Sequence, residues 1–230
     1  MKILAIIPAR GGSKRIPGKN IKNFAGQPII KYSIDAAIKS ECFIEVMVST
    51  DDKKTAKLAK SFKASVPFLR SKKNSTDMAM IIPVLEEVIT EYKKRGKEFK
   101  YICCIFPTAP FITAERLKLA KQLMIEKNAE AIVPVVKFSY PIQRALKIKN
   151  GIAKMFWPKN YNSRSQDLEP AYHDCGQFYF LKTDVIFKQK RLFPRFTVPL
   201  EIPETEVQDI DNEQDWKVAE IKYKLLKDFL

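Results

Sequence analysis

The sequence predicts an α/β fold, in which a mostly parallel sheet carries helices on both faces. Apolar runs of strand length alternate along the chain with amphipathic stretches of helix length, as expected when crossover helices connect parallel strands. A loop rich in glycine and cationic residues follows the first apolar run, and ligands bind at this position in such sheets. The 230 residues can bury a substantial core, so we interpret 1–230 as one domain.

The first part of the chain supplies most of the regular structure. Four apolar runs are interpreted as strands, and a shorter run is interpreted as an extended segment. Four helices are expected between them, one of which opens after Asp51-Asp52 and another of which contains Pro83, which should kink it or mark a break. The strands are expected over 3–7, 44–49, 101–106 and 131–136, the extended segment over 64–69, and the other helices over 28–39, 76–94 and 113–127.

The pattern changes after residue 136. Residues 138–175 contain short apolar runs separated by turns, and Asn150-Gly151 between two such runs is a strong β-hairpin signal. A lone hairpin is not stable in water, and this insertion is too small to form a second domain. Strands over 176–181 and 195–200, a short helix over 183–187 and a last helix from Asn212 complete the expected fold.

The charge of +15, from 41 Lys and Arg against 26 Asp and Glu, allows several anionic partners. These are nucleic acid, an acidic membrane surface or a small-molecule substrate. Lysines are scattered through every expected helix, without an arginine-rich stripe or a nucleic-acid motif. We therefore favour a solvated basic surface that helps gather an anionic small molecule, with no nucleic-acid partner. A basic nucleic-acid-binding α/β domain is the rival interpretation.

The compartment is expected to be the cytoplasm. No apolar run approaches the roughly 20 residues that span a bilayer, and the N-terminal stretch does not have the pattern of a signal peptide. The four cysteines lack metal-site spacing, and Cys103-Cys104 lies inside an apolar run. They are expected to be reduced thiols, mostly in the core.

The glycine-rich loop is expected to bind a polyphosphate. It reads Ile7-Pro8-Ala9-Arg10-Gly11-Gly12-Ser13-Lys14-Arg15-Ile16-Pro17-Gly18-Lys19-Asn20. Gly11-Gly12 allows the backbone to approach a ligand closely, so that successive N–H groups can hold phosphate oxygens. The spacing fits neither a Walker loop nor Gly-x-Gly-x-x-Gly. Arg10 and Lys19 are the best phosphate clamps, Lys14 and Arg15 are expected at the rim, and an exposed basic turn is the alternative.

Asp209 and Asp211 are candidate metal ligands. In an extended run, residues two apart project to the same side, so both carboxylates would point together while Ile210 packs opposite. Mg²⁺ commonly binds one or two carboxylates together with phosphate oxygens. The alternative is structural, because Asp211 or Asn212 could cap the last helix.

The loop pattern Pro-Ala-Arg-x-x-Ser-Lys-x-x-Pro-x-Lys-Asn resembles the CTP-binding loop of the sugar cytidylyltransferases that activate nonulosonic acids. The resemblance extends over almost the whole chain. It implies a Rossmann-like fold of the nucleotide-diphospho-sugar transferase type, with CTP and a nine-carbon acidic sugar as substrates and Mg²⁺ as cofactor. It also implies a homodimer, in which residues 138–175 reach across to complete the active site of a second subunit.

The resemblance also implies roles for individual residues. Arg10 would contact the triphosphate, Lys19 the charge developing on the phosphoryl group, and Arg70 the region of the cytosine. Asp209-Ile210-Asp211-Asn212-Glu213 matches the family's magnesium site. The implied nucleotide-binding set is Pro8, Ala9, Arg10, Gly11, Gly12, Ser13, Lys19, Asn20 and Arg70, and the implied catalytic set is Arg10, Lys19, Asp209 and Asp211.

The residues expected to contact the sugar differ from those of the sialic acid enzymes. Phe106-Pro107-Thr108-Ala109-Pro110 stands where those enzymes carry Gln-Pro-Thr-Ser-Pro, which argues against sialic acid. This loop also lacks the aspartate of the 3-deoxy-manno-octulosonate enzymes. Residues 162–179 form the second long match, in which Arg164 could pair with a sugar carboxylate. The expected substrate-binding residues are Phe106, Thr108, Gln143, Arg144, Arg164 and Gln177, whereas His173 and Cys175 are expected to be structural.

Overall fold

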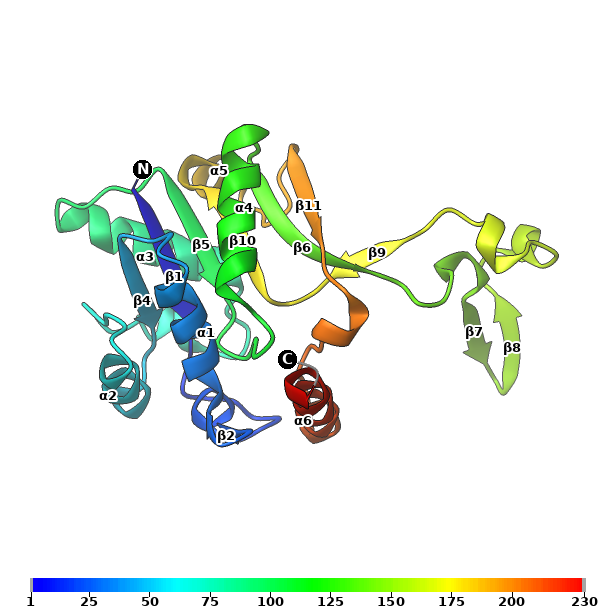
Figure 1. Cartoon of the computed structure of the whole chain (residues 1–230), viewed down its shortest axis with the longest axis horizontal. Helices are drawn as coiled ribbons and strands as arrows, with labels where there is room; N and C mark the ends of the chain where they lie inside the picture. Colours follow the sequence, from blue (N-terminus) through cyan, green and yellow to red (C-terminus); the bar gives the residue numbers. More distant parts are fainter. Residues whose placement is uncertain (1, 229–230) are drawn as a thin grey trace.

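The computed structural model describes residues 2–228, and a seven-stranded sheet forms its centre (Figure 1). Only β10 and the short β9 run antiparallel to their neighbours, so the predicted mostly parallel sheet is confirmed. The strand order is β11 (Thr197–Glu201), β6 (Ala131–Lys137), β10 (Phe178–Lys182), β5 (Tyr101–Ile105), β1 (Ile3–Pro8) and β4 (Glu45–Ser49), and β9 (Tyr172–Asp174) pairs with the end of β6.

Helices cover both faces of this sheet because the inner strands are apolar on both sides. Along β1, Ile3 and Ala5 face one buried cluster, and Leu4 and Ile6 face the other. This alternation follows from the two-residue period of a strand, and strands buried on both faces are typical of parallel sheets. The first cluster packs against α1 (Ile29–Lys39), α2 (Lys53–Ser61) and α4 (Ala114–Glu126), and the second against α3 (Ile81–Lys94) and α5 (Thr183–Gln189).

A third buried cluster joins the two ends of the chain. Ile16, from the glycine-rich loop, packs with Phe24, Ile210 and Trp216 of α6 (Glu213–Asp228). Phe24 lies in a small ribbon of β2 (Asn23–Phe24) and β3 (Gln27–Pro28), and its ring meets that of Trp216 edge to face at 5.5 Å. This cluster fixes the loop after β1 against the segment that carries Asp209 and Asp211.

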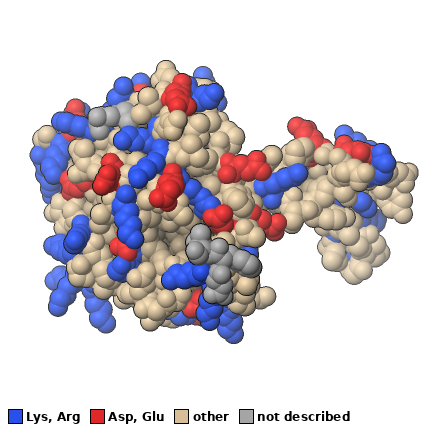
Figure 2. All heavy atoms as spheres, in the orientation of Figure 1, with Lys and Arg blue, Asp and Glu red and all other residues tan. Residues whose placement is uncertain are grey.

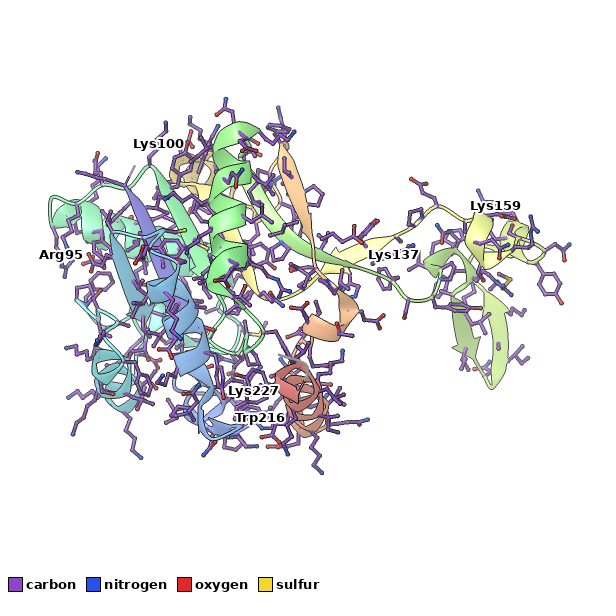
Figure 3. The ribbon with its side chains drawn as sticks, viewed as in Figure 1. Arg95, Lys100, Lys137, Lys159, Trp216 and Lys227 are labelled. Carbon is purple, nitrogen blue, oxygen red and sulfur yellow. The ribbon has the colours of Figure 1, made fainter. Side chains whose placement is uncertain are left out.

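The predicted hairpin is present, and it projects away from the body of the molecule (Figure 1). It consists of β7 (Leu146–Lys149) and β8 (Ile152–Met155), and Asn150 and Gly151 at the turn both have positive φ, at 52° and 75°. Residues 138–171, which we call the arm, leave the body beyond Lys137 at the end of β6 and carry Lys159 near the far end (Figure 3). Apolar side chains of the hairpin face solvent, including Ile148 at 77% and Ile152 at 60% exposure.

One expected element, the extended segment, pairs with the sheet at a single position, and one expected helix begins at a different residue. Residues 64–69 form only one isolated bridge, from Met47 to Ser65, and no strand. The helix expected from residue 76 begins at Ile81, and Asp77 lies in the loop before it. Pro83 therefore occupies the first turn, where the missing N–H has no intrahelical partner to lose, and it causes no break.

Three short strands were not predicted from the sequence. The strands β2, β3 and β9 are two or three residues long, which is too short for a periodicity to show. Within residues 2–228, no helix combines the length and the apolar character that crossing a membrane requires.

Candidate active site

A cleft of about 510 Å³ lies where β1 and β5 end at their carboxyl edge. It brings together residues that are far apart in the sequence, and most of the predicted nucleotide-binding side chains face it. The residues that line it are Pro8, Arg10, Ser13, Lys14, Arg15, Lys19, Asn20, Arg70, Asp77, Ala79, Ile81, Val84, Phe106, Pro107, Thr108 and Asp211.

Two hydrogen bonds between backbone groups of the glycine-rich loop and polar side chains stabilise the conformation of the loop. The N–H of Gly11 donates to the carboxylate of Asp51 at 2.9 Å, and Asn20 Nδ2 donates to the carbonyl of Arg10 at 2.9 Å. A Cβ at Gly11 would lie 2.7 Å from Cβ of Asp52, whereas one at Gly12 would meet nothing within 4 Å. Gly11 is therefore required by close packing against the start of α2. Ala9, predicted to bind the nucleotide, is fully buried and lies beneath the loop.

Lys19 occupies the floor of the cleft. Gly18, with φ of 63°, turns the chain into a single 3₁₀ turn at Lys19–Ile21, and Lys19 Nζ donates to the carbonyl of Ile210. Burial lowers the pKa of Lys19, and the charges of Asp211 and Asp209 act in the opposite direction. The ammonium group of Lys19 therefore lies between the glycine-rich loop and residues 209–211.

Arg70 is a buried cation at the side of the cleft. Its Nε donates to the hydroxyl of Ser49 at 3.0 Å and its Nη2 to the carbonyl of the same residue. Burial lowers its pKa, although Asp51 and Glu87 oppose this effect. Two bonds to a neutral residue leave guanidinium capacity for a ligand.

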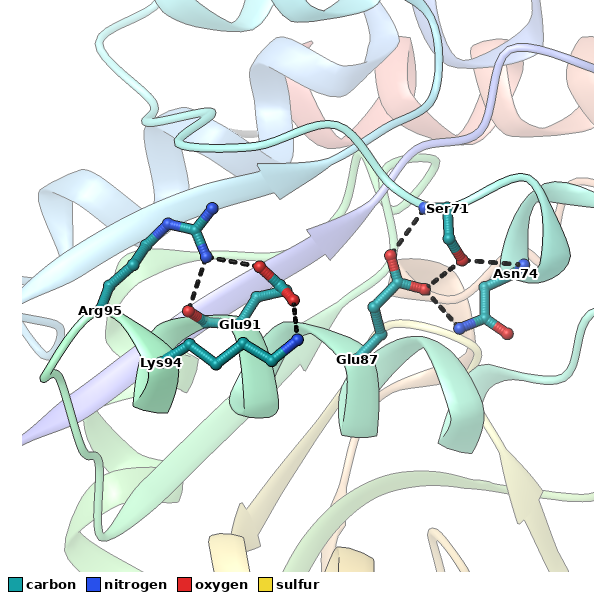
Figure 4. A network of polar contacts seen from close by, with 6 residues as sticks. All are labelled: Ser71, Asn74, Glu87, Glu91, Lys94 and Arg95. Atoms are coloured by element: carbon teal, nitrogen blue, oxygen red, sulfur yellow. Dashed lines mark hydrogen bonds and ion pairs between the residues drawn. The ribbon is translucent and has the colours of Figure 1, made fainter.

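The loop that follows Arg70 is tied to α3 by one carboxylate. Glu87 accepts from the N–H of Ser71 at 2.7 Å, from its hydroxyl at 2.6 Å and from Asn74 Nδ2 at 2.5 Å (Figure 4). Further along the same helix, Glu91 pairs with Lys94 and Arg95 on the surface (Figure 4). The Glu87 network therefore fixes the entry to the segment that carries Asp77.

Asp77 is a site residue that the sequence pattern did not identify. Its carboxylate pairs with Arg10 Nη1 at 2.5 Å and with Lys14 Nζ at 2.5 Å. These two bonds hold the pKa of Asp77 below its usual range. Thr76-Asp77 was interpreted as the start of a helix, and no local signal places Asp77 beside a loop 67 residues away.

Asp211 lies at the other rim of the cleft, and Asp209, two residues before it, is not among the residues that line the cleft. Asp211 pairs with Arg15 at 2.8 Å, and Asp209 lies against Gly176, where an added Cβ would be 3.5 Å from its carboxyl carbon. Burial and the charge of Asp211 raise the pKa of Asp209, and Lys19 partly offsets this. Two carboxylates that repel each other form a donor set suited to a divalent cation.

The capping alternative is confirmed for Asn212 and is wrong for Asp211. Asn212 Oδ1 accepts from the N–H groups of Gln214 and Asp215, and Asp215 accepts in return from those of Asp211 and Asn212. This reciprocal arrangement is a capping box. Asp211 contributes only its backbone N–H, so its side chain remains free for the cleft. No group of three or more His, Cys, Asp and Glu side chains within residues 2–228 is arranged to hold a metal.

Phe106 and Thr108 line the cleft, whereas Gln177 lies beneath it. The Phe106 ring meets the Tyr179 ring edge to face at 5.7 Å, and its N–H donates to the carbonyl of Gln177 at 2.9 Å. Gln177 is only 3% exposed; its Nε2 donates to the carbonyl of Glu206, and its Oε1 has no partner among the described residues. An apolar ring therefore borders the cleft at the position expected for the sugar.

The other three predicted sugar contacts lie on the arm, outside the lining of the cleft. Gln143 Nε2 donates to the carbonyl of Glu169, Arg144 Nη1 to the hydroxyl of Ser165 at 3.4 Å, and Arg164 Nε to Asp167 at 2.8 Å. Within one chain the structure does not bring them to Arg10 and Lys19.

The contacts of the histidine and the burial of the cysteines indicate structural and not catalytic roles. The ring of His173 packs on Phe138 at 4.6 Å, and its Nδ1 contacts the carbonyl of Asp174. All four cysteines are free and buried, as expected, and burial raises the pKa of Cys175 to about 12. A thiol that stays protonated at neutral pH is a poor nucleophile.

The cleft is cationic within a surface where charges of both signs are interspersed. Figure 2 shows Lys and Arg spread over this face of the body and over the arm, with Asp and Glu between them. Around the cleft, five cationic side chains face two carboxylates: Arg10, Lys14, Arg15, Lys19 and Arg70 against Asp77 and Asp211. This arrangement can neutralise a polyanion such as a triphosphate without covalent chemistry from the protein.

Comparisons with known proteins agree with this chemistry. The family model described as cytidylyltransferase matches residues 4–211. A pseudaminic acid cytidylyltransferase of Campylobacter jejuni is 40% identical over 98% of this chain and 97% of its own length. A CMP-N,N'-diacetyllegionaminic acid synthase of Legionella pneumophila is 34% identical over 96% of this chain and 95% of its own.

Solved structures share the fold. A CMP:2-keto-3-deoxy-manno-octonic acid synthetase in complex with CTP superposes with a TM-score of 0.72 at 17% identity, over 99% of this chain and 100% of the other.

Proposed function

The chain belongs to the cytidylyltransferase family, and on that premise we propose that it transfers CMP from CTP to pseudaminic acid. The observation that carries this proposal is the 40% identity to a pseudaminic acid cytidylyltransferase over 98% of the chain. The loop found here, Gly-Gly-Ser-Lys-Arg-Ile-Pro-Gly-Lys-Asn-Ile, also resembles the loop of pseudaminic acid cytidylyltransferases more than that of the other nonulosonic acid enzymes. Legionaminic or N-acetylneuraminic acid is the alternative acceptor.

In the proposed reaction, the anomeric hydroxyl of the sugar attacks the α-phosphorus of CTP. A bond from the sugar oxygen to this phosphorus forms, the bond from the phosphorus to the oxygen that bridges to the β-phosphate breaks, pyrophosphate leaves, and the proton of the hydroxyl group passes to solvent. Arg10 would clamp the phosphates in place of Asp77, and Lys19 would stabilise the negative charge that builds up. Such a reaction depends mainly on positioning and charge stabilisation.

Asp209 and Asp211 would hold Mg²⁺. The proposal is supported by the pKa of Asp209, which burial and the charge of Asp211 raise and which a bound divalent cation would lower, and by the freedom of the Asp211 side chain from helix capping. When bound, the ion would neutralise part of the triphosphate charge. A direct test measures binding of Mg²⁺ by calorimetry to the protein and to its Asp209→Asn variant.

We also propose a cytoplasmic homodimer in which the arm contacts the second copy. The free buried cysteines are consistent with a reducing compartment. Apolar side chains along the arm, such as Leu146, Ile148 and Phe156, are more than half exposed in the single chain, and contiguous exposed apolar surface marks interaction sites. The sugar-contacting candidates of the arm would then serve the cleft of the partner.

The choice of sugar is tested by kinetics with three acids. A buried hydroxyl that faces the Phe106 ring would lose a hydrogen bond at a cost of about 1–3 kcal/mol. Pseudaminic acid carries a terminal methyl group where sialic acid carries a hydroxymethyl group. We expect at least about a tenfold higher kcat/KM for pseudaminic than for N-acetylneuraminic acid, measured as pyrophosphate release with CTP and Mg²⁺.

A matched variant and a salt titration complete this test. Phe106→Gln should reduce the kcat/KM preference for pseudaminic over N-acetylneuraminic acid, because the glutamine amide can form a hydrogen bond with the sugar hydroxyl. Legionaminic acid shares the methyl group, so only direct comparison separates it from pseudaminic acid. Equal or better turnover of N-acetylneuraminic acid contradicts the assignment. Tight, steeply salt-dependent binding to DNA or RNA without cytidylyl transfer would instead favour the nucleic-acid interpretation.

A further inference from the structure

A second cavity lies at the opposite edge of the sheet from the cleft. Its volume is about 650 Å³, larger than that of the cleft, and it is bordered by Lys100, which directly precedes β5, and by Thr183, which directly follows β10. Figure 3 labels Lys100 at this end of the body and Trp216 at the end where α6 packs under the glycine-rich loop. No residue lines both cavities.

One wall of this cavity is apolar. Ile89 of α3 and Phe99 are buried members of the second core cluster, and Phe187 of α5 is 43% exposed beside them. Pockets of this size with apolar walls and a few polar groups are typical small-molecule sites. The wall therefore suits a flat apolar ring.

The rim of the cavity carries more cations than carboxylates. Its two acidic residues are already paired, Glu98 with Lys93 at 3.5 Å and Asp184 with Lys188 at 2.8 Å. Lys97 is paired with Glu45 at 2.9 Å. Two further cations have no carboxylate partner within the described residues.

These two cations are Lys100 and Lys182. Lys100 Nζ lies 5.4 Å from the ring centroid of Tyr101, and Lys182 Nζ donates to the neutral oxygens of Asn128 at 2.8 and 3.0 Å. An ammonium group has three N–H donors, so each of these two lysines keeps at least one donor for the anionic group of a ligand.

We propose that this cavity is a second binding site, for a small organic anion that carries a planar apolar ring. The ring would pack on Phe99 and Phe187, and the anionic group would lie between Lys100 and Lys182. The site does not depend on the chemistry of the cleft, because it shares none of its side chains.

Phenyl phosphate is a suitable probe, because it is one ring with one phosphate. Calorimetry on the full chain, with CTP saturating and no sugar present, should give saturable binding of one molecule per chain. Inorganic phosphate and phenol, which each lack one half of the probe, should bind at least about tenfold more weakly. Lys100→Ala and Phe187→Ser should each weaken the probe at least about fivefold. Lys57→Ala, on α2 and outside this cavity, is the control and should change nothing.

The position at which the probe binds can be determined from the NMR signals of two isoleucines on one helix. Ile89 borders this cavity and Ile81 borders the cleft, and both belong to α3. In methyl NMR spectra, phenyl phosphate should shift Ile89 and leave Ile81 unchanged, and CTP should shift Ile81. Thermal melts verify that both variants remain folded. The proposal is overturned by absence of saturable binding, by unchanged affinity in both variants, or by a probe that shifts Ile81 and not Ile89.

Discussion

The side chain of Asp211 lines the cleft and contributes little to the fold. Among residues 2–228 its carboxylate forms an ion pair with the exposed Arg15 alone, and Asn212 and Asp215 supply the helix cap. Asp211→Ala should therefore abolish turnover and leave the melting temperature nearly unchanged, because a surface ion pair is worth about 0–1 kcal/mol. Activity and thermal melts measure the two effects.

The control for this variant is another surface carboxylate. Glu91→Ala removes the pairs with Lys94 and Arg95 on α3, away from the cleft, and should retain full activity. If Asp211→Ala keeps near wild-type activity at limiting Mg²⁺, the metal assignment is wrong.

Asp209 makes stability depend on pH. Its folded-state pKa is raised by burial and by Asp211, so between the unfolded and the folded pKa the native state binds more protons than the unfolded state does. The stability associated with this group is present at pH below its ordinary pKa and is lost as pH rises through the raised value. At neutral pH without metal, Asp209→Asn should be more stable than the parent protein.

Thermal melts across pH test this sign. The advantage of Asp209→Asn should shrink in acid, where the parent carboxyl is protonated, and should shrink again when Mg²⁺ is added to the parent. A variant that is less stable at neutral pH in metal-free buffer would show that the carboxylate has a favourable structural partner instead.

At the scale of the element, the glycine-rich loop offers a paired test. A Cβ at Gly11 would clash with Asp52 at 2.7 Å, while one at Gly12 has open space. Because the contact is with the side-chain stem of a helix cap, the loop must shift, and misplacement of positioning groups on the order of 1 Å can cost 10²-fold in rate. Gly11→Ala should thus lower kcat/KM for CTP by about 10–100-fold.

Gly12→Ala is the matched control for this loop. It should keep kcat/KM within about threefold of the parent unless its N–H is the one that approaches the phosphate most closely. If kcat/KM falls equally in both variants, the loop needs backbone freedom at both glycines. If both variants keep the kcat/KM of the parent, the loop accommodates the Cβ at Gly11 without loss of activity.

At the scale of the whole molecule, the arm decides how many chains make one active site. Lys19→Ala removes the cleft cation, and Arg164→Ala removes the arm guanidinium, so each variant alone should be inactive. If the arm serves the partner's cleft, half of the randomly mixed dimers hold one intact site. Activity should then recover to roughly a quarter of the parent value after mixing and reassembly.

The control mixes two variants of the same cleft. Lys19→Ala with Asp211→Ala leaves every site defective and should give no recovery. Absence of recovery with Lys19→Ala and Arg164→Ala as well would place the arm outside the partner's active site. Sedimentation of each variant verifies that dimers form.

The sequence alone determined the fold class, because strands, helices and turns are encoded locally, and its resemblance to the sugar cytidylyltransferases indicated most of the residues that line the cleft. Alternating apolar runs gave the sheet and its helices, Asp52 and Thr113 act as the N-caps at the expected places, and Asn150-Gly151 forms the expected turn. Strand period, cap chemistry and turn chemistry all depend on neighbouring residues, and can therefore be predicted without the fold.

Only the tertiary structure decided which distant groups meet. It placed Asp77 on Arg10 and buried Gln177 under the cleft. It also inserted β10 antiparallel between β5 and β6, a pairing that no periodicity encodes. The reason is physical: contacts across tens of residues depend on the path of the whole chain, and that path is set by the burial of many side chains at once.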